Sequence, residues 1–240
     1  MSDVYAALAA SLPCRWRAQP DAAVLVALVA LDDWALWIPQ APALLDDSER
    51  ARVARRRYPA HARALAFAYA AHRVILAELL DVPVTRLRIE RDAKGCPRLP
   101  GDRVHTSLSH ADGVVAVAVA ASGRVGIDIE SRMRAREMPE IAARVLHPRE
   151  VPGMAALPIA ARGMALLDLW VRKEAVLKAA GVGLERGMET LWLPPDGMVG
   201  IAPAGVTTCV KSLAVGDDWV VAVSAPPGTP VDWAWLRSAA

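Results

Sequence analysis

The sequence has 240 residues, 28 of them Lys or Arg and 26 Asp or Glu, and its formal net charge of +2 gives no indication of a nucleic-acid partner. Hydrophobic residues make up 54% of the chain, which is ample material for a core. The apolar run over residues 22–31 is about half the roughly 20 residues that a membrane-spanning helix needs. We therefore expect neither a membrane span nor, in the absence of a basic segment followed by a long apolar one, a secretory signal.

The predicted elements alternate between strands and helices. Apolar runs, acidic helix starts and Gly/Pro punctuation predict a strand over 22–31, a helix beginning at 46–49, a helix over 60–80, a strand over 86–90, a loop over 93–101, and strands over 114–120 and 125–130. Next come a helix around 139–146, a Pro/Gly-rich loop, a helix over 160–180, short strands including 219–223, and a strand or coil after 226. The repeated order predicts an α/β (α+β) fold of two similar lobes, 1–122 and 123–240.

The cysteines give no sign of a disulfide framework or a zinc site. Cys14, Cys96 and Cys209 are odd in number and far apart, and no C-x-x-C pair occurs. This pattern favours a reducing, cytoplasmic compartment, and we expect the chain to be a monomer.

Five arginines lie within eight residues, at Arg50, Arg52, Arg55, Arg56 and Arg57. Two interpretations stay open for this cluster. It is either the solvated face of a helix or a site for several phosphate groups.

A pair of carboxylates occurs in Gly126–Glu130, which reads Gly-Ile-Asp-Ile-Glu. Side chains alternate along a strand, so Asp128 and Glu130 point to one face while Ile127 and Ile129 point to the core. Mg²⁺ prefers oxygen ligands and often takes one or two carboxylates together with substrate phosphates. The alternative is an edge strand with two solvated acids.

A charged face is predicted on the helix over 160–180. Trp170, Glu174 and Lys178 are spaced i, i+4 and i+8, and Lys173 lies beside them. One interpretation places a third carboxylate on the metal and a lysine on a phosphate. The other is a Glu174–Lys178 surface pair worth about 0.3–0.5 kcal/mol, with Trp170 as a core anchor in both.

Ser109 and His110 end the segment 107–110 just before the strand over 114–120. The histidine could donate a hydrogen bond to a phosphate oxygen, or it could be a turn or core residue. No G-x-S-x-G motif and no acidic partner at a recognisable motif is present, so a Ser-His-Asp triad is not indicated.

These three motifs, in this order, resemble the surfactin-type 4′-phosphopantetheinyl transferases, which carry a Ser-His motif, a G-[IV]-D-I-E strand and W-x-x-K-E-x-x-x-K on a helix. The likeness extends from about Ser48 to Leu193. It implies two similar α/β lobes with coenzyme A in the cleft between them. It also implies transfer of 4′-phosphopantetheine from coenzyme A to a serine of an apo acyl or peptidyl carrier protein, with release of adenosine 3′,5′-bisphosphate. The acceptor would serve fatty acid, polyketide or nonribosomal peptide biosynthesis.

The resemblance also implies roles for particular residues. Asp128, Glu130 and Glu174 would ligate Mg²⁺, and Glu150, which matches a glutamate of the longer members, would be the general base unless a metal-bound water takes that part. Glu174, Lys178 and His110 would be the other catalytic residues. The coenzyme A contacts would be Arg52, Arg73, Arg91, Lys94, Ser109, His110, Lys173 and Lys178.

The sequence departs from the family pattern in two places. Cys96 stands where the family usually has the lysine of a G-K-P loop, and Lys94 or Arg98 could replace that lysine. The asparagine that often precedes the Ser-His motif is replaced by Thr106 or Ser107.

Two alternatives of other classes remain. The chain could be a coenzyme A-binding module without catalytic activity, which the intact carboxylate and lysine set argues against. It could also be a carrier-protein-binding module that uses apolar patches around Met188 and Trp192, although the clustered charges would then have no explanation.

Overall fold

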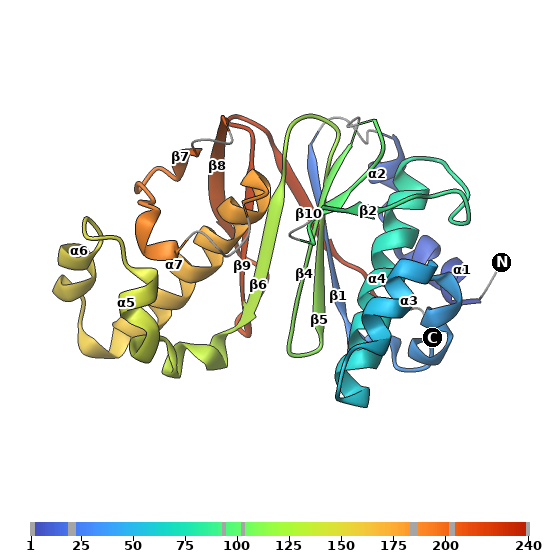
Figure 1. Ribbon diagram of the computed structural model, residues 1–240, viewed down its shortest axis with the longest axis horizontal. Helices are drawn as coiled ribbons and strands as arrows, with labels where there is room; N and C mark the ends of the chain where they lie inside the picture. Colours follow the sequence, from blue (N-terminus) through green and yellow to red (C-terminus); the bar gives the residue numbers. More distant parts are fainter. Residues whose placement is uncertain are drawn as a thin grey trace.

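Two four-stranded sheets lie next to each other in the computed structural model, and helices cover their outer sides (Figure 1). The structure describes residues 3–18, 23–92, 95–101, 104–182, 187–201 and 205–238. The first sheet has the order β10 (Val231–Trp235), β1 (Val24–Ala30), β5 (Val114–Ala120) and β4 (His105–Ala111). The second has the order β6 (Gly126–Ser131), β9 (Trp219–Ala225), β8 (Val206–Leu213) and β7 (Met198–Ile201).

The helices fall into two groups, one beside each sheet. The first sheet is accompanied by α1 (Asp3–Ser11), α2 (Cys14–Ala18), α3 (Asp47–Ala54), α4 (Pro59–Leu79) and the 3₁₀ turns η1 (Leu31–Trp34) and η2 (Ile38–Leu44). The second is accompanied by α5 (Ala142–Val145), α6 (Val151–Ala156), α7 (Ile159–Ala180), η3 (Arg132–Arg136), η4 (Met138–Ile141) and η5 (Met188–Thr190). A two-stranded ribbon of β2 (Glu90–Arg91) and β3 (Pro97–Arg98) lies on the side of the first sheet.

Both halves follow the same plan. In each, a first strand is followed by helices and then by an antiparallel hairpin whose second strand pairs with the first strand: β1 with β5 and β4, and β6 with β9 and β8. This repetition agrees with the predicted mixed fold. The boundary between the two predicted lobes falls between β5 and β6, but β10 returns to the first sheet and pairs in parallel with β1.

Three apolar cores explain the strand sequences. One lies between the first sheet and α1 and α4, a second between the second sheet and α7, and a third between the two sheets. In β1, Leu25 and Ala27 belong to the first core while Val26 and Leu28 belong to the third. Because both faces of the inner strands are buried, their sequences are continuous apolar runs instead of alternating ones.

Most of the predicted elements are confirmed, and the differences have local causes. Residues 86–89 are not a strand: Leu87 and Ile89 are buried in the first core from an irregular segment, and the carbonyl of Leu87 accepts from Arg73. The predicted helix at 139–146 is η4 followed by α5, the loop after it contains α6, and the predicted loop at 93–101 contains β3. The Ser107–His110 segment lies within β4, which the sequence reading missed. Within the described ranges, no helix is at once long and apolar enough to cross a membrane.

Candidate active site

β4, β6 and α7 meet at the candidate site, and Gly126 permits their close approach. A Cβ atom at Gly126 would lie 2.0 Å from the carbonyl oxygen of Ala175 and 2.5 Å from the amide nitrogen of Ala179, both in α7. Asp128 and Glu130 follow Gly126 at two-residue intervals, so their side chains share its face and point toward α7. The alternate residues Ile127 and Ile129 are buried between the sheets, as predicted.

Lys178 joins the three elements. Its Nζ donates to Oδ1 of Asp128 at 2.6 Å, to Oγ of Ser109 at 2.9 Å and to the carbonyl oxygen of Ile127 at 3.0 Å. Ser109 in turn donates to Oδ1 of Asp128 at 2.7 Å. The carboxylate of Asp128 is therefore held by one charged and one neutral donor in a buried position.

Glu130 is neutralised from the next segment of the chain. Its carboxylate forms an ion pair with Arg134, whose guanidinium lies 5.2 Å from the centre of the Trp170 ring. Burial raises the pKa of Glu130, and the charge of Arg134 partly offsets this. Trp170 therefore contacts the site through Arg134 as well as packing against the second core.

Glu174 has the most perturbed carboxyl group of the site. Burial is the main cause that raises its pKa to about 7, followed by the negative charge of Asp128, while Lys178 acts in the opposite direction. The charge of Glu130 adds a smaller increase. The three carboxylates thus repel one another, and the cluster is short of positive charge.

This donor set fits the chemistry of a hard divalent cation, because carboxylate oxygens are the ligands that Mg²⁺ prefers. Such a cation would offset both the burial and the carboxylate repulsion that raise the pKa of Glu174. The side chains do not converge as they stand: among the residues that the structure describes, no three His, Cys, Asp or Glu side chains are grouped so that they could hold a metal ion.

A cavity of about 560 Å³ opens beside this cluster. Glu174 and Lys178 line it together with aromatic, apolar and basic side chains, of which the basic ones are Arg56, Arg91, Arg98, His105, His110 and Arg124. A second hollow of about 520 Å³ shares His110 with the first and is also lined by Glu130 and Arg134. Burial is the main cause that lowers the pKa of His110, and the charges of Lys178 and Arg56 lower it further, which favours the neutral imidazole at pH 7.

Arg91 and Arg52 lie at the end of the cavity near the β2–β3 ribbon. Arg91 lines the cavity, stacks over the ring of Tyr69 at 4.5 Å and donates to the carbonyl oxygen of Gly95 at 3.1 Å. Arg52 donates to the hydroxyl of Tyr69 at 3.2 Å and neighbours Gly95. Arg52 thus contacts lining residues without being one of the described residues that line the cavity.

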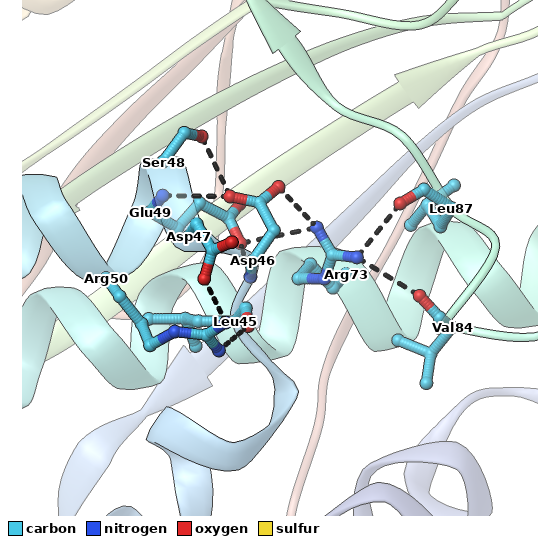
Figure 2. Close-up of polar contacts among 9 residues, drawn as sticks. All are labelled: Leu45, Asp46, Asp47, Ser48, Glu49, Arg50, Arg73, Val84 and Leu87. Carbon is cyan, nitrogen blue, oxygen red and sulfur yellow. Dashed lines mark hydrogen bonds and ion pairs between the residues drawn. The ribbon is translucent and has the colours of Figure 1, made fainter.

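Arg73, predicted to contact coenzyme A, is instead buried in the first half of the chain. Figure 2 shows its guanidinium between Asp46 and Glu49 on one side and the carbonyl oxygens of Val84 and Leu87 on the other. Asp46 and Glu49 also form the capping box that begins α3. Arg73 therefore ties the start of α3 to the segment after α4, and it is not among the described residues that line the cavity.

Glu150 and Lys173 form a separate buried ion pair at 2.6 Å. Neither is among the described lining residues of either hollow, so the predictions of Glu150 as a base and Lys173 as a coenzyme A contact gain no support from position. Lys94 lies outside the described residues. Two arginines that line the cavity were not predicted as site residues. Arg124, whose guanidinium donates to the carbonyl oxygen of Ala180 at the end of α7, was missed altogether. Arg56 could have been found only as one member of the arginine cluster.

Comparison with known proteins shows which family the region around β6 and α7 resembles. Residues 124–219 match the family described as the 4′-phosphopantetheinyl transferase superfamily. The 4′-phosphopantetheinyl transferase HetI of Nostoc sp. is 31% identical over 149 residues, which cover 60% of this chain and 62% of that protein. A putative 4′-phosphopantetheinyl transferase of Synechocystis sp. is 29% identical over 155 residues, covering 63% of each chain.

A third relative is the 4′-phosphopantetheinyl transferase Gsp of Aneurinibacillus migulanus, 28% identical over 122 residues, which cover 50% of this chain and 49% of that protein. The chain thus spans about three fifths of the length of the first two relatives and about half of the third. Residues 124–219, which hold Asp128, Glu130, Glu174 and Lys178, carry the sequence pattern of the 4′-phosphopantetheinyl transferase superfamily.

Proposed function

We propose that this protein transfers the 4′-phosphopantetheine group of coenzyme A to a serine of an apo carrier protein, as a surfactin-type member of the superfamily. The observation that carries the proposal is the Lys178–Asp128–Ser109 network, whose Lys178 lines a cavity with several basic side chains. It lies next to a carboxylate, Glu174, whose pKa is raised mainly by burial and further by the negative charges of Asp128 and Glu130. A site that brings phosphates to a divalent cation needs both features.

The cavity suits a phosphorylated nucleotide. Its volume of about 560 Å³ falls within the usual range of ligand pockets. Arg56, Arg91, Arg98 and Arg124 line it, and the guanidinium group is well matched to bidentate contact with phosphate oxygens. The aromatic ring of Tyr69 and apolar side chains such as Leu65 and Leu99 provide surface for the uncharged parts of coenzyme A.

Asp128, Glu130 and Glu174 would hold Mg²⁺, which when bound would neutralise charge on the diphosphate. In the transfer, the serine oxygen forms a bond to the β-phosphorus of coenzyme A. The bond from that phosphorus to the bridging oxygen breaks, and adenosine 3′,5′-bisphosphate leaves with the bridging oxygen. The ammonium of Lys178 and the N–H of the neutral His110 imidazole would stabilise charge on the phosphate oxygens, and the serine proton would pass to water in the cavity.

The chain would act in the cytoplasm, consistent with three free cysteines, and as a monomer. Its acceptor would be a carrier protein of fatty acid, polyketide or nonribosomal peptide biosynthesis.

Mass spectrometry of an apo carrier protein incubated with the enzyme, coenzyme A and Mg²⁺ tests the proposal. We expect one phosphopantetheine group on the acceptor serine. Asp128→Asn should lower kcat at least about 100-fold, because it removes a charge that acts on the transition state. Asp168→Asn is the matched control: Asp168 lies on α7, contacts Ser212 and Arg172, and should leave transfer unchanged. Coenzyme A binding without transfer would identify an inactive binding module, and carrier binding alone an interaction module.

A further inference from the structure

Lys173 is buried on α7 with its charge fully coordinated. Its side chain is 0% exposed. Its Nζ donates to Oε2 of Glu150 at 2.6 Å and to the carbonyl oxygens of Val145 at 2.7 Å and Met188 at 3.2 Å. An ammonium group has three donors, so the whole hydrogen-bonding capacity of Lys173 is used within the protein and none remains for a substrate.

Most of the acceptor capacity of Glu150 is also used within the protein, because a carboxylate has about four lone-pair sites and three of them accept from the protein's own donors. Besides Lys173, its Oε2 accepts from the backbone amide of His147 at 2.9 Å, and its Oε1 accepts from the backbone amide of Leu193 at 2.9 Å. Both oxygens thus bind the protein's own donors. A general base needs a free lone pair within hydrogen-bonding reach of the nucleophile, and neither hollow includes Glu150 among its described lining residues.

The pair connects segments that are far apart in the sequence. The turn at 145–150 and the segment at 188–193 are both fixed to Lys173, directly or through Glu150. Lys173 is followed directly by Glu174, and successive side chains of a helix are rotated by about 100° about its axis. Holding Lys173 on one side of α7 therefore determines where Glu174 points, and Lys178 lies about one turn beyond.

We propose that Glu150 and Lys173 form a positioning pair that fixes the rotation of α7 and so directs Glu174 and Lys178 into the cavity, and that Glu150 does not take the serine proton. This inference rests on the proposed function for its kinetic consequences. The contacts themselves do not depend on it.

The test is a double-mutant cycle of Glu150→Gln, Lys173→Met and the double variant, read by kcat as a function of pH and by the urea midpoint of unfolding without Mg²⁺. Each single variant leaves one buried charge without its partner, whereas the double variant removes both charges. We expect each single change to lower kcat at least about tenfold and to lower the midpoint. We expect the double variant to regain most of the lost kcat and most of the lost urea midpoint. Its kcat should also fall toward low pH in the same way as that of the wild type, so that the acid limb of its pH profile is unchanged.

Two results would overturn the inference. A general base contributes about 10²–10⁴-fold, so a Glu150→Gln variant that loses the acid limb, or a double variant as slow as Glu150→Gln, would make Glu150 catalytic. The rate at each pH is divided by the folded fraction measured at that pH, so the profile decides the matter even for a poorly folded variant. If the wild type itself transfers nothing, the proposed function fails, and absence of coupling in the unfolding midpoints would then overturn the pair on its own.

Discussion

Lys178 illustrates how a single side chain serves several partners at the site. Its side chain is 27% exposed, yet the ammonium is hydrogen-bonded to β4 through Ser109 and to β6 through Asp128. From the sequence alone, Lys178 was either directed at a phosphate or one partner of a surface pair with Glu174. In the structure, the ammonium of Lys178 already forms an ion pair with Asp128, so a bound phosphate oxygen would share this ammonium with Asp128.

Cys96 stands where the family usually has a lysine, and variants of Cys96 and Arg98 test whether Arg98 replaces that lysine. Cys96 lines the cavity, and burial followed by the charge of Asp92 raises the pKa of its thiol, so it is neutral at pH 7. Arg98 also lines the cavity and is paired with Asp92 at 3.1 Å. Arg98→Ala should raise the Kd for coenzyme A several-fold to about a hundredfold by calorimetry, since charged hydrogen bonds are worth about 1.5–3 kcal/mol and exposed pairs less.

The matched variants for this prediction are Cys96→Lys and Arg88→Ala. If Arg98 replaces the family lysine, as we propose, Cys96→Lys should change the Kd by less than about threefold. Arg88 is exposed and is not among the described lining residues, so Arg88→Ala should change nothing. A large gain in coenzyme A affinity from Cys96→Lys, together with no loss of affinity from Arg98→Ala, would show that Arg98 does not replace the family lysine.

His72 makes stability depend on pH. It is 0% exposed, and its Nε2 lies 2.8 Å from Oγ1 of Thr106, which itself donates to the carbonyl oxygen of Ala118. Nε2 is therefore the protonated nitrogen, and Nδ1 has no hydrogen-bond partner among the described residues. Burial is the main cause that lowers the pKa of His72 to about 3, with the charges of Arg91 and Arg73 contributing.

The unfolded chain binds this proton near pH 6.5 and the folded protein near pH 3, so the unfolded state holds more protons between the two values. The free energy of unfolding contributed by His72 therefore falls as the pH falls through this window, by about 2 kcal/mol between pH 7 and pH 5. Urea unfolding at both pH values measures the loss. His72→Gln, which cannot titrate, should reduce it by this amount, and an equal loss in both proteins would exclude His72 as its source.

At the scale of elements, the close contact of β6 with α7 brings the charged side chains of the candidate site together. Gly126 lies against the backbone of α7, and the three nearest atoms that an added Cβ would meet are all backbone atoms that no side-chain rotation can move away. The carboxylates of β6 and the charged residues of α7 are within reach of one another because this contact is so close.

Gly126→Ala should lower the free energy of unfolding by about 3 kcal/mol, because the strand and the helix must separate to admit the methyl group. Gly153→Ala is the control: Gly153 lies in α6 with open space around its Cβ position, so alanine should be neutral or stabilising by up to about 1 kcal/mol. Urea unfolding compares the two. Equal effects would mean that the β6–α7 contact is not tightly packed.

The predicted elements succeeded where the signal was local. The alternation in 126–130 and the helix that ends at Gly181, which adopts a left-handed conformation at φ 67°, were predicted from neighbouring residues alone. The predicted strand at 86–90 was wrong over 86–89, because its alternation comes from burial of Leu87 and Ile89 in an irregular segment, and only Glu90 lies in a strand. Contacts between residues that are far apart in the sequence could not be predicted from local patterns. Nothing in the sequence around Arg73 indicates that its guanidinium binds Asp46 and Glu49.

At the scale of the whole molecule, the C-terminal segment closes the first sheet. β10 pairs with β1, and Leu236 after it is 0% exposed in the first core. The amide of Leu236 donates to the carbonyl oxygen of Leu28 at 2.8 Å, and its carbonyl oxygen accepts from the indole of Trp34 at 3.2 Å. The two predicted lobes, 1–122 and 123–240, therefore share a sheet through β10, and the division of the chain at 122/123 stays a prediction.

Leu236→Ala should lower the free energy of unfolding by about 2–5 kcal/mol, the usual cost of a large-to-small change in a core. Leu36→Ala is the matched control, because Leu36 is 75% exposed and its loss should cost less than about 0.5 kcal/mol. Thermal or urea unfolding of both variants checks this. Similar values would mean that the C-terminal segment contributes little to the first core.

The pairing of β1 with β10 also affects how the chain folds during its synthesis. Roughly 200 residues separate the two strands, and at about 5–20 residues per second the ribosome needs on the order of 10–40 s to make them. Through that interval the edge of β1 that later binds β10 has no partner, and a bare strand edge is a template for pairing with other chains. The nascent protein is therefore exposed to misassociation until β10 emerges, and chaperone supply or translation rate should govern its yield more than its final stability does.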